Sequence, residues 1–445
     1  MELVYKINDK PSPEKILLFA LQQLLAVMAA TIAVPAIVGN GLSASAALFG
    51  AGVGTIVYLL FTKSKSPVFL GSSFAFIGSM FSAFAGAASA SVGYWGLILG
   101  AVMAGLVYVI IAVVVRVAGT AWIDRLLPPV IIGPTVAIIG LSLSGNAVGD
   151  LAKSSVDGGS THIAMLCGLV TLFVTMMCST YGRKLGKLIP FIQGILTGYI
   201  LASVFAVIGH LTNNPALIVI NYAALRALDW TSLSSYISLP DFTFALGGAS
   251  GLKGITASYL LTIFAAYVPV AFVVFAEHLA DHKNLSAIVG VDLLKDPGLT
   301  RTLLGDGVGT MVSTLFGGCP NTTYGESIGC VAITKNASTV SIWCCAILCI
   351  VFSLITPAVA FLETIPSCVM GGVCIALYGF IAVSGLKMFQ NIDLSENKNL
   401  FVTSVILITG VGGMIVKFGA VEIRTVACAL ILGIAANILL SRAKK

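Results

Sequence analysis

Residues 317–329 read GGCPNTTYGESIG, and residues 67–79, a stretch of the same character, read PVFLGSSFAFIGS. Both are poor in Leu and rich in Gly, Ser, Thr and Pro, although each lies in an apolar part of the chain. The first part of each stretch tolerates an extended strand better than a helix. Extended backbone at membrane depth is allowed only where it is buried in protein or lines a cavity. The two stretches therefore predict a pair of interrupted membrane segments around a buried site.

Composition places the chain in a membrane. It has 445 residues, of which 58% are hydrophobic and only 9% are charged, whereas soluble domains carry about 25% charged residues. Residues 16–62 and 66–115 contain no Asp, Glu, Lys or Arg. A spanning helix needs about 20 apolar residues, so each run is long enough for two helices. We expect an all-α polytopic membrane protein.

Fourteen segments are candidates for membrane spans. They lie near residues 16–38, 43–62, 68–84, 92–115, 127–146, 162–180, 188–209, 258–279, 300–317, 321–334, 337–361, 367–385, 400–417 and 420–441. The third and tenth are short and weak as helices, and they contain the two interrupted stretches.

The positions of the 24 Lys and Arg residues support this count. Cytoplasmic loops carry an excess of these residues. With the N-terminus in the cytoplasm, fourteen spans leave outside only Lys153, Arg226, Lys253, Lys417 and Arg424. Both termini are therefore expected in the cytoplasm, and the net charge of +6 serves mostly as inner-leaflet anchoring.

A polar connection near residues 210–257 divides the spans into seven and seven. An odd number per half turns the halves into opposite orientations, and inverted-topology repeats are a recurring transporter plan. The interrupted stretches are third in each half. We expect their two short strands to pair near the midplane and to lead into half-helices that start near Phe74 and near Tyr324. Helix N-termini offer free N–H groups to ligand carbonyl oxygens.

Three acidic residues do not look like loop residues, namely Glu277, Glu326 and Asp306. An ionisable group inside a membrane marks a functional site by default. We expect Glu277 and Glu326 to face one midplane cavity, where they suit a neutral ligand with N–H donors, a cation or protons. Asp306 is expected to make a polar contact between helices.

The surroundings of Glu277, FAEHLADHK at residues 275–283, leave an alternative open. Glu277 and Asp281 are four residues apart and share a helix face, so they could hold one proton as a coupled pair. Alternatively, Asp281 has already reached cytoplasmic water. His278 points away from this face, and we expect His282 and Lys283 to lie in cytoplasmic water.

Other classes of protein find no support in the sequence. The ten cysteines form no CxxC pair and fall mostly in apolar spans, where a thiol acts as a small hydrophobe. No metal-ligand cluster, nucleophile elbow or phosphate loop is evident. We expect no enzyme activity, no metal and no cofactor, and no nucleic-acid partner because no basic reading face is present.

Several motifs resemble the bacterial uracil permeases of the nucleobase–ascorbate transporter family. They are GGCPNTTYGESIGCVAIT (317–334), AEH (276–278), DLLKDPGLTRTLLGDG (292–307), GSSFAFI (71–77), LLPPVIIGPTVAIIGLSL (126–143) and MGGVCIALYGFIAVSGLK (370–387). The similarity runs along the whole chain, and NTTYGE is typical of the pyrimidine branch. The resemblance implies a proton-coupled uracil importer in the cell inner (plasma) membrane, and it is compatible with a homodimer.

The resemblance also implies an organisation. It makes the seven-plus-seven inverted repeat a core domain, residues 1–125 and 258–362, and a gate domain, residues 126–257 and 363–445. A xanthine or other purine symporter of the same fold is an alternative. An anion transporter of the sulfate-permease type is less compatible, because two cavity carboxylates would repel an anion.

The same resemblance assigns residues. It places uracil on the carboxylates of Glu277 and Glu326 and on the backbone of Phe74 and Gly325, with Tyr378 as a gate tyrosine. Tyr324 or Phe74 could add a flat apolar wall. Proton coupling then involves Glu277, Glu326 and Asp281. Relatives have a histidine at the position of Asp281, which leaves two alternatives: a Glu277–Asp281 pair couples protons instead, or the coupling differs in its pH dependence.

Overall fold

The computed structural model describes residues 3–120, 122–123, 127–183, 189–388, 390, 392–418, 421–423 and 425–442. Some cations used in the charge argument lie outside these residues, as does the expected domain boundary at residues 125–126; the cations are Arg125, Lys184, Lys187, Arg424, Lys444 and Lys445.

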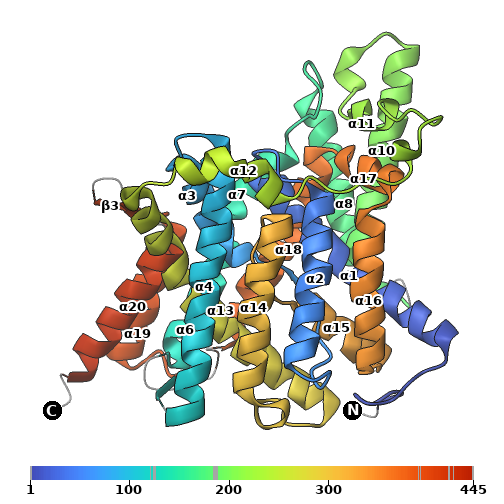
Figure 1. Cartoon of the computed structure of the whole chain (residues 1–445). Coiled ribbons are helices and arrows are strands. Elements are labelled where there is room, and N and C mark those ends of the chain that lie inside the picture. Colours follow the sequence, from blue (N-terminus) through green and yellow to red (C-terminus); the bar gives the residue numbers. More distant parts are fainter. Residues whose placement is uncertain are drawn as a thin grey trace.

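The chain is mostly helical (Figure 1). Its first half contains α1 (Pro13–Val38), α2 (Ala44–Phe61), β1 (Leu70–Ser72), η1 (Phe74–Phe76), α3 (Ile77–Ala85), α4 (Ala90–Ala118), α6 (Pro129–Ser142), α7 (Ser144–Leu151), α8 (Thr161–Tyr181) and α10 (Pro190–Leu211). The connection contains η2 (Pro215–Leu217), α11 (Ala223–Arg226), η3 (Leu233–Ser235) and α12 (Thr243–Lys253). The second half contains α13 (Ala257–Val289), η4 (Leu294–Gly298), α14 (Leu299–Gly317), β2 (Asn321–Thr323), α15 (Gly325–Thr334), α16 (Thr339–Ser353), α17 (Thr356–Glu363), α18 (Ser367–Met388), α19 (Asn397–Val411), β3 (Val416–Phe418), β4 (Val421–Ile423) and α20 (Thr425–Arg442).

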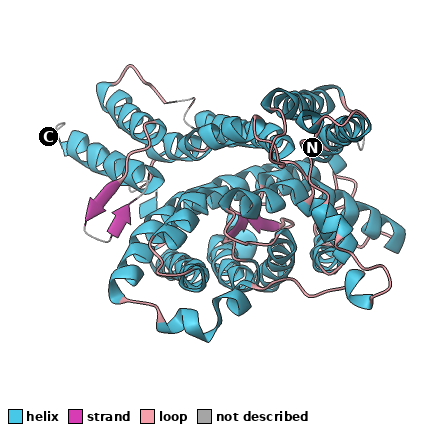
Figure 2. Ribbon diagram, turned by 90° about the horizontal axis from the view of Figure 1, so that it is seen from above, coloured by secondary structure: helices cyan, strands magenta, loops and turns pink. Residues whose placement is uncertain are grey.

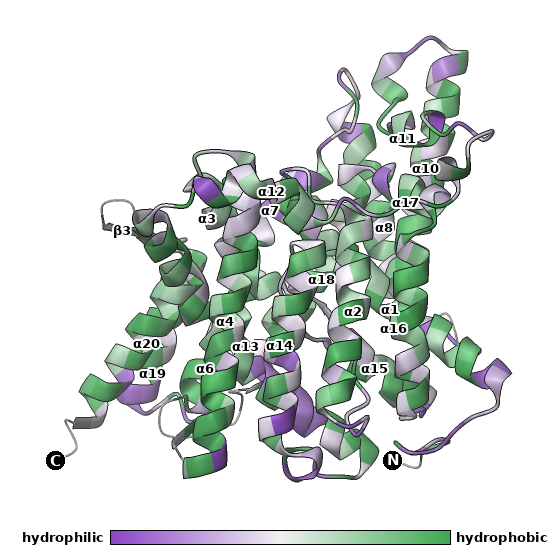
Figure 3. Ribbon diagram, in the orientation of Figure 1, coloured by the Kyte–Doolittle hydropathy of each residue, from purple (hydrophilic) through white to green (hydrophobic). Residues whose placement is uncertain are grey.

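Apolar helices dominate the fold, as expected for a polytopic membrane protein. Among the described residues, 8 helical segments are long and apolar enough to cross a membrane, and further apolar helices are shorter. Figure 3 shows hydrophobic residues along the helices and hydrophilic residues gathered towards their ends. The number of fourteen spans stays a prediction.

The helices pack as two groups. In one group, α14 packs against α2 and α4, α16 against α1 and α2, and α13 against α4. In the other, α18 packs against α6, α7 and α8, and α19 against α6 and α20. Glycines permit the closest approaches, because a Cβ at Gly50 would lie 2.5 Å from the Ser313 carbonyl oxygen, and one at Gly140 would lie 2.2 Å from that of Tyr378. Small residues at such crossings are typical of membrane helices.

The two interrupted stretches pair as the sequence predicted. β1 and β2 are antiparallel, with Leu70 opposite Thr323 and Ser72 opposite Asn321, and Figure 2 shows a two-stranded pair enclosed by helices. Side chains complete the hydrogen bonding of this short ribbon. The Thr55 hydroxyl contacts both N–H and C=O of Leu70, and the Thr310 hydroxyl donates to the Asn321 carbonyl at 2.6 Å. Buried extended backbone is stable because these groups are satisfied.

Several predicted boundaries were wrong. The ends of the last two spans were predicted at residues 417 and 420, but residues 416–418 and 421–423 form the antiparallel strands β3 and β4, and α20 begins at Thr425. The segments VKF and VEI alternate apolar and polar residues, which favours a strand. The fifth span is divided into α6 and α7, and the eleventh into α16 and α17. The eighth was predicted to end near residue 279, whereas α13 continues to Val289.

Candidate functional site

A cavity of about 740 Å³ lies between the two helix groups. One wall comes from η1, α13, β2 and α15, and the opposite wall comes from α6, α10 and α18. Because β1 and β2 are antiparallel, η1 and α15 start at opposite ends of the ribbon, and residues of both line the cavity. Segments from both halves of the sequence therefore build one site.

Most residues that the sequence singled out line this cavity. They are Phe74, Glu277, Asp281, Tyr324, Gly325 and Glu326. Tyr378 does not line it. Its ring instead meets the ring of Phe74 edge-on, with centroids 5.7 Å apart. Tyr378 therefore stands behind the cavity wall, on α18.

The start of α15 lines the cavity. Tyr324 is the N-cap in extended conformation, Gly325 is the first helical residue, and Glu326 lies in the first turn. Gly325 lines the cavity, and a Cβ added there would meet nothing within 4 Å. The first N–H groups of a helix lack intrahelical partners. The turn η1 begins at Phe74, so both expected half-helix starts are confirmed.

Asp281 belongs to the cavity rather than to outside water. Its carboxylate accepts a hydrogen bond from the Thr323 hydroxyl of β2 at 2.7 Å. Glu277 lies one turn earlier and Asn284 about one turn later, and both also line the cavity. The stacked Glu277–Asp281 arrangement is therefore present on one face of α13.

The sequence analysis missed a residue that supports this wall. Gln23, buried on α1, donates to the hydroxyl of Ser327, which in turn accepts from the N–H of Phe69 at 2.9 Å. Tyr324 also donates its hydroxyl to the Ser72 carbonyl at 2.6 Å. Together they bind α15 to β1. An amide within an otherwise apolar helix was the signal, since polar side chains there commonly bond across helices.

Known proteins match this chain over nearly its whole length. The sequence pattern of the permease family, the xanthine/uracil permeases, matches residues 14–418. The chain belongs to this permease family. The uracil permease of Bacillus subtilis (strain 168) is 38% identical over 447 residues, which is 99% of this chain and 95% of the relative. The uracil permease of Escherichia coli (strain K12) is 36% identical and covers 97% of this chain and 93% of its own.

Solved structures support the fold of the permease. The transmembrane domain of the cyanobacterial bicarbonate transporter BicA has a TM-score of 0.59 at 16% identity, covering 97% of this chain and 99% of its own. The murine anion transporter Slc26a9 has a TM-score of 0.63 at 13% identity, covering 98% of this chain and 69% of its own. At these identities the likeness concerns architecture alone. The all-α transporter fold is confirmed, and the permease is a transporter rather than an enzyme.

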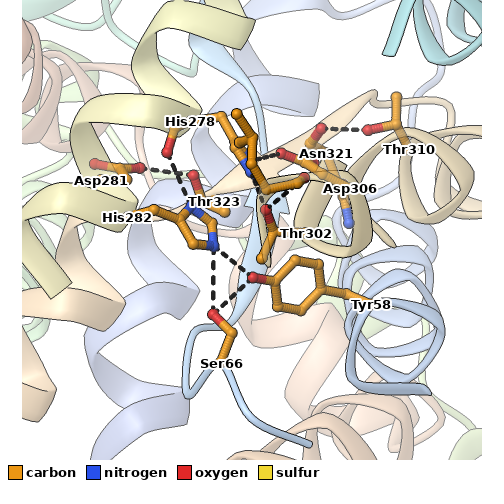
Figure 4. Close-up of polar contacts among 11 residues, drawn as sticks. Tyr58, Ser66, His278, Asp281, His282, Thr302, Asp306, Thr310, Asn321 and Thr323 are labelled. Atoms are coloured by element: carbon orange, nitrogen blue, oxygen red, sulfur yellow. Dashed lines mark hydrogen bonds and ion pairs between the residues drawn. The ribbon is translucent and has the colours of Figure 1, made fainter. Parts of the chain in front are cut away.

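A second polar cluster of the permease lies behind the cavity wall, on the other side of α13 (Figure 4). His278 Nδ1 lies 2.7 Å from an Asp306 carboxylate oxygen, and both side chains are at most 1% exposed. His278 Nε2 lies 3.0 Å from the Thr302 hydroxyl. The expected contact of Asp306 between helices is thereby confirmed, and its partner is His278 of α13.

The expectation for His282 was wrong. Its side chain is only 1% exposed. Its Nδ1–H donates to the His278 carbonyl at 2.9 Å, and Nε2 lies 2.7 Å from the Tyr58 hydroxyl. The reason is that α13 continues past residue 282, so this position still faces α2 instead of solvent. Lys283 is exposed, as predicted.

Proposed function

We propose that this permease imports uracil together with protons. The observation that carries the proposal is the cavity, which brings Glu277, Asp281 and Glu326 together with the helix starts at Phe74 and Gly325. The uracil permeases of Bacillus subtilis and Escherichia coli, which are similar over nearly the whole chain, support uracil as the substrate.

The chemistry of uracil fits this set of groups. Uracil has two N–H donors, which suit the carboxylates of Glu277 and Glu326. Its two carbonyl oxygens suit the backbone N–H groups of Phe74 and Gly325 at the helix starts. Tyr324 and Phe74 both line the cavity and offer aromatic faces to the ring. The contact of Tyr378 with Phe74 makes it the proposed gate tyrosine.

Proton coupling is assigned to the three carboxylates. Negative charges sharing one small cavity repel one another, so a proton taken up there relieves the repulsion. The Asp281 carboxylate also accepts a hydrogen bond from the Thr323 hydroxyl, next to the helix start at α15. Protonation of Asp281 therefore alters a hydrogen bond beside the part of the wall that is proposed to contact the ligand.

The two helix groups supply the moving parts of this proposal. We assign residues 1–125 and 258–362 to a core domain and residues 126–257 and 363–445 to a gate domain, with the cavity between them. We place the protein in the inner (plasma) membrane, and the distribution of Lys and Arg supports both termini in the cytoplasm. A homodimer is a further expectation, to be checked by the mass of the protein in nanodiscs.

Uptake of labelled uracil into vesicles tests the proposal. Glu277→Gln and Glu326→Gln are expected to lower the affinity by about 10- to 100-fold each, since a hydrogen bond to a charged group contributes about 1.5–3 kcal/mol. Glu363→Gln is the control, because Glu363 ends α17 and does not line the cavity. A protonophore should stop accumulation. Near-normal uptake by either cavity variant would refute the site, and accumulation driven by sodium alone would refute the coupling.

Competition separates the alternatives. If the substrate were xanthine or another purine, excess uracil would fail to displace the labelled purine from the purified protein. The fold neighbours include anion transporters, but three carboxylates in one cavity oppose an anion. Displacement of uracil by bicarbonate or sulfate would contradict this electrostatic argument.

A further inference from the structure

One cation shares the cavity with the carboxylates. Lys387 lies in the last turn of α18 and lines the same cavity as Glu277, Asp281 and Glu326. Among the described residues that line the cavity, it is the only basic one. The opposite charges stand on different helix groups, because the carboxylates belong to α13 and α15, which pack in the group of α2 and α14, whereas α18 packs with α6 and α8.

We propose that Lys387 is a coupling residue, which favours proton release from the carboxylates while the cavity has the shape seen here. The inference rests on the proposed proton-coupled import. A nearby cation stabilises a charged carboxylate relative to its protonated form. When the two helix groups move relative to each other, the distance from Lys387 to the carboxylates changes. Proton affinity then differs between the two ends of the transport cycle without any change in the carboxylates themselves.

The charge of Lys387 matters because the other charged side chains near Asp281 are negative. The other charged side chains around Asp281 are carboxylates: Glu277 on its own helix and Glu326 on α15 line the same cavity, and Asp306 lies on α14. The histidines of α13 face the opposite way, since His278 binds Asp306 and His282 lies against Tyr58. Within the part of the chain that the structure describes, Lys387 is thus the one cationic cavity-lining group, and its charge opposes protonation.

The size of the effect follows from the cavity. A sphere of 740 Å³ is about 11 Å across, and a unit charge at that distance moves the protonation midpoint of a carboxyl by about 0.3–1 pH unit, for an effective dielectric constant of about 20 to 80. Loss of the cation favours the protonated form, so the midpoint moves to higher pH. In a symporter, uracil binds better to the protonated protein, and its affinity falls as pH rises through this midpoint.

The test is the pH dependence of uracil affinity, measured by calorimetry on the purified full-length protein between about pH 5 and pH 9. For Lys387→Gln we expect the midpoint to rise by about 0.3–1 pH unit, with the affinity at low pH unchanged. Lys387→Arg should match wild type. Lys398→Gln is the matched control, because Lys398 lies in the first turn of α19 and does not line the cavity.

Three outcomes would overturn the proposed role of Lys387. A Lys387→Gln profile that superimposes on a pH-dependent wild-type profile would overturn the role of Lys387 while leaving proton-coupled import in place. A wild-type profile that is flat would refute proton coupling and, with it, this role. Loss of affinity in both the Gln and Arg variants at every pH would show a packing role instead, and would also overturn the inference.

Discussion

Replacing His278 by Leu should be among the most destabilising single changes in this permease. His278 and Asp306 are 0% and 1% exposed and join α13 to α14 at 2.7 Å. Removing one partner of a buried pair leaves the other buried without its partner, which destabilises the folded protein by about 3–5 kcal/mol. We therefore expect the free energy of unfolding to fall by about that amount.

The hydrogen bonds of Thr302 determine how many protons the His278–Asp306 pair holds. The Thr302 hydroxyl donates to the Leu299 carbonyl at 3.1 Å, so it accepts from His278 Nε2–H at 3.0 Å. One further proton is then shared between His278 Nδ1 and Asp306, and the pair as a whole is neutral. In Asp306→Asn, the amide can donate to Nδ1 and keep a neutral hydrogen bond. That variant should lose only about 1 kcal/mol.

A double-mutant cycle on reversible unfolding in mixed micelles measures the pair. The variant with both His278→Leu and Asp306→Leu should be less destabilised than the two single Leu variants added together, because no buried charge is left unpaired. Single changes that add within about 0.5 kcal/mol would refute the coupling. So would a loss below about 1 kcal/mol for His278→Leu, which would mean that water or another group satisfies Asp306.

Two further predictions concern the cavity wall. Gly325→Ala should leave stability unchanged but weaken uracil binding, since its Cβ would meet no protein atom within 4 Å and would enter the cavity. Gly71→Ala should instead destabilise the ribbon, because its Cβ would lie 2.3 Å from the Tyr324 ring. Thermal melts and calorimetry on both variants separate the two effects, and the reverse pattern would contradict the geometry. Thr323→Val should move the pH midpoint of uracil affinity upward, because the hydroxyl donates to the Asp281 carboxylate at 2.7 Å and favours its charged form; an unchanged pH profile would show that Asp281 does not take part in coupling.

Predictions from the sequence were most accurate for residues that are energetically unfavourable in a membrane unless they are buried or paired. Strand-like stretches in an apolar region must be buried against each other, and β1 and β2 are paired. Carboxylates in such a region need a cavity or a partner. Glu277 and Glu326 line the cavity, and Asp306 has a partner. Each of these predictions needed only the local sequence and the solvent around it.

Predictions failed where the answer depended on which helix lies alongside. His282 resembles a residue that has left the membrane, because Lys283 follows it and the apolar run has ended. However, α13 continues until Gly290, whose left-handed conformation (φ 72°) ends the helix. Over that length the rings of His278 and His282 lie with their centroids 4.1 Å apart, and the Tyr58 hydroxyl of α2 forms a hydrogen bond with His282. A polar residue can thus be buried at the end of an apolar run when the neighbouring helix offers a partner.

The role of Lys387 also depends on which helix lies alongside, although this residue, unlike His282, is exposed. Its sequence position, at the end of an apolar helix, is that of a cytoplasmic anchor, and its side chain is indeed exposed. Only the arrangement of α18 across the cavity from α13 and α15 makes it line the same cavity as the carboxylates. A charge can therefore follow the topology rule and still act on the site. For a transporter whose cavity lies between two groups of helices, a charge on one group can thus be linked to carboxylates on the other. Patterns within a single segment do not reveal this link.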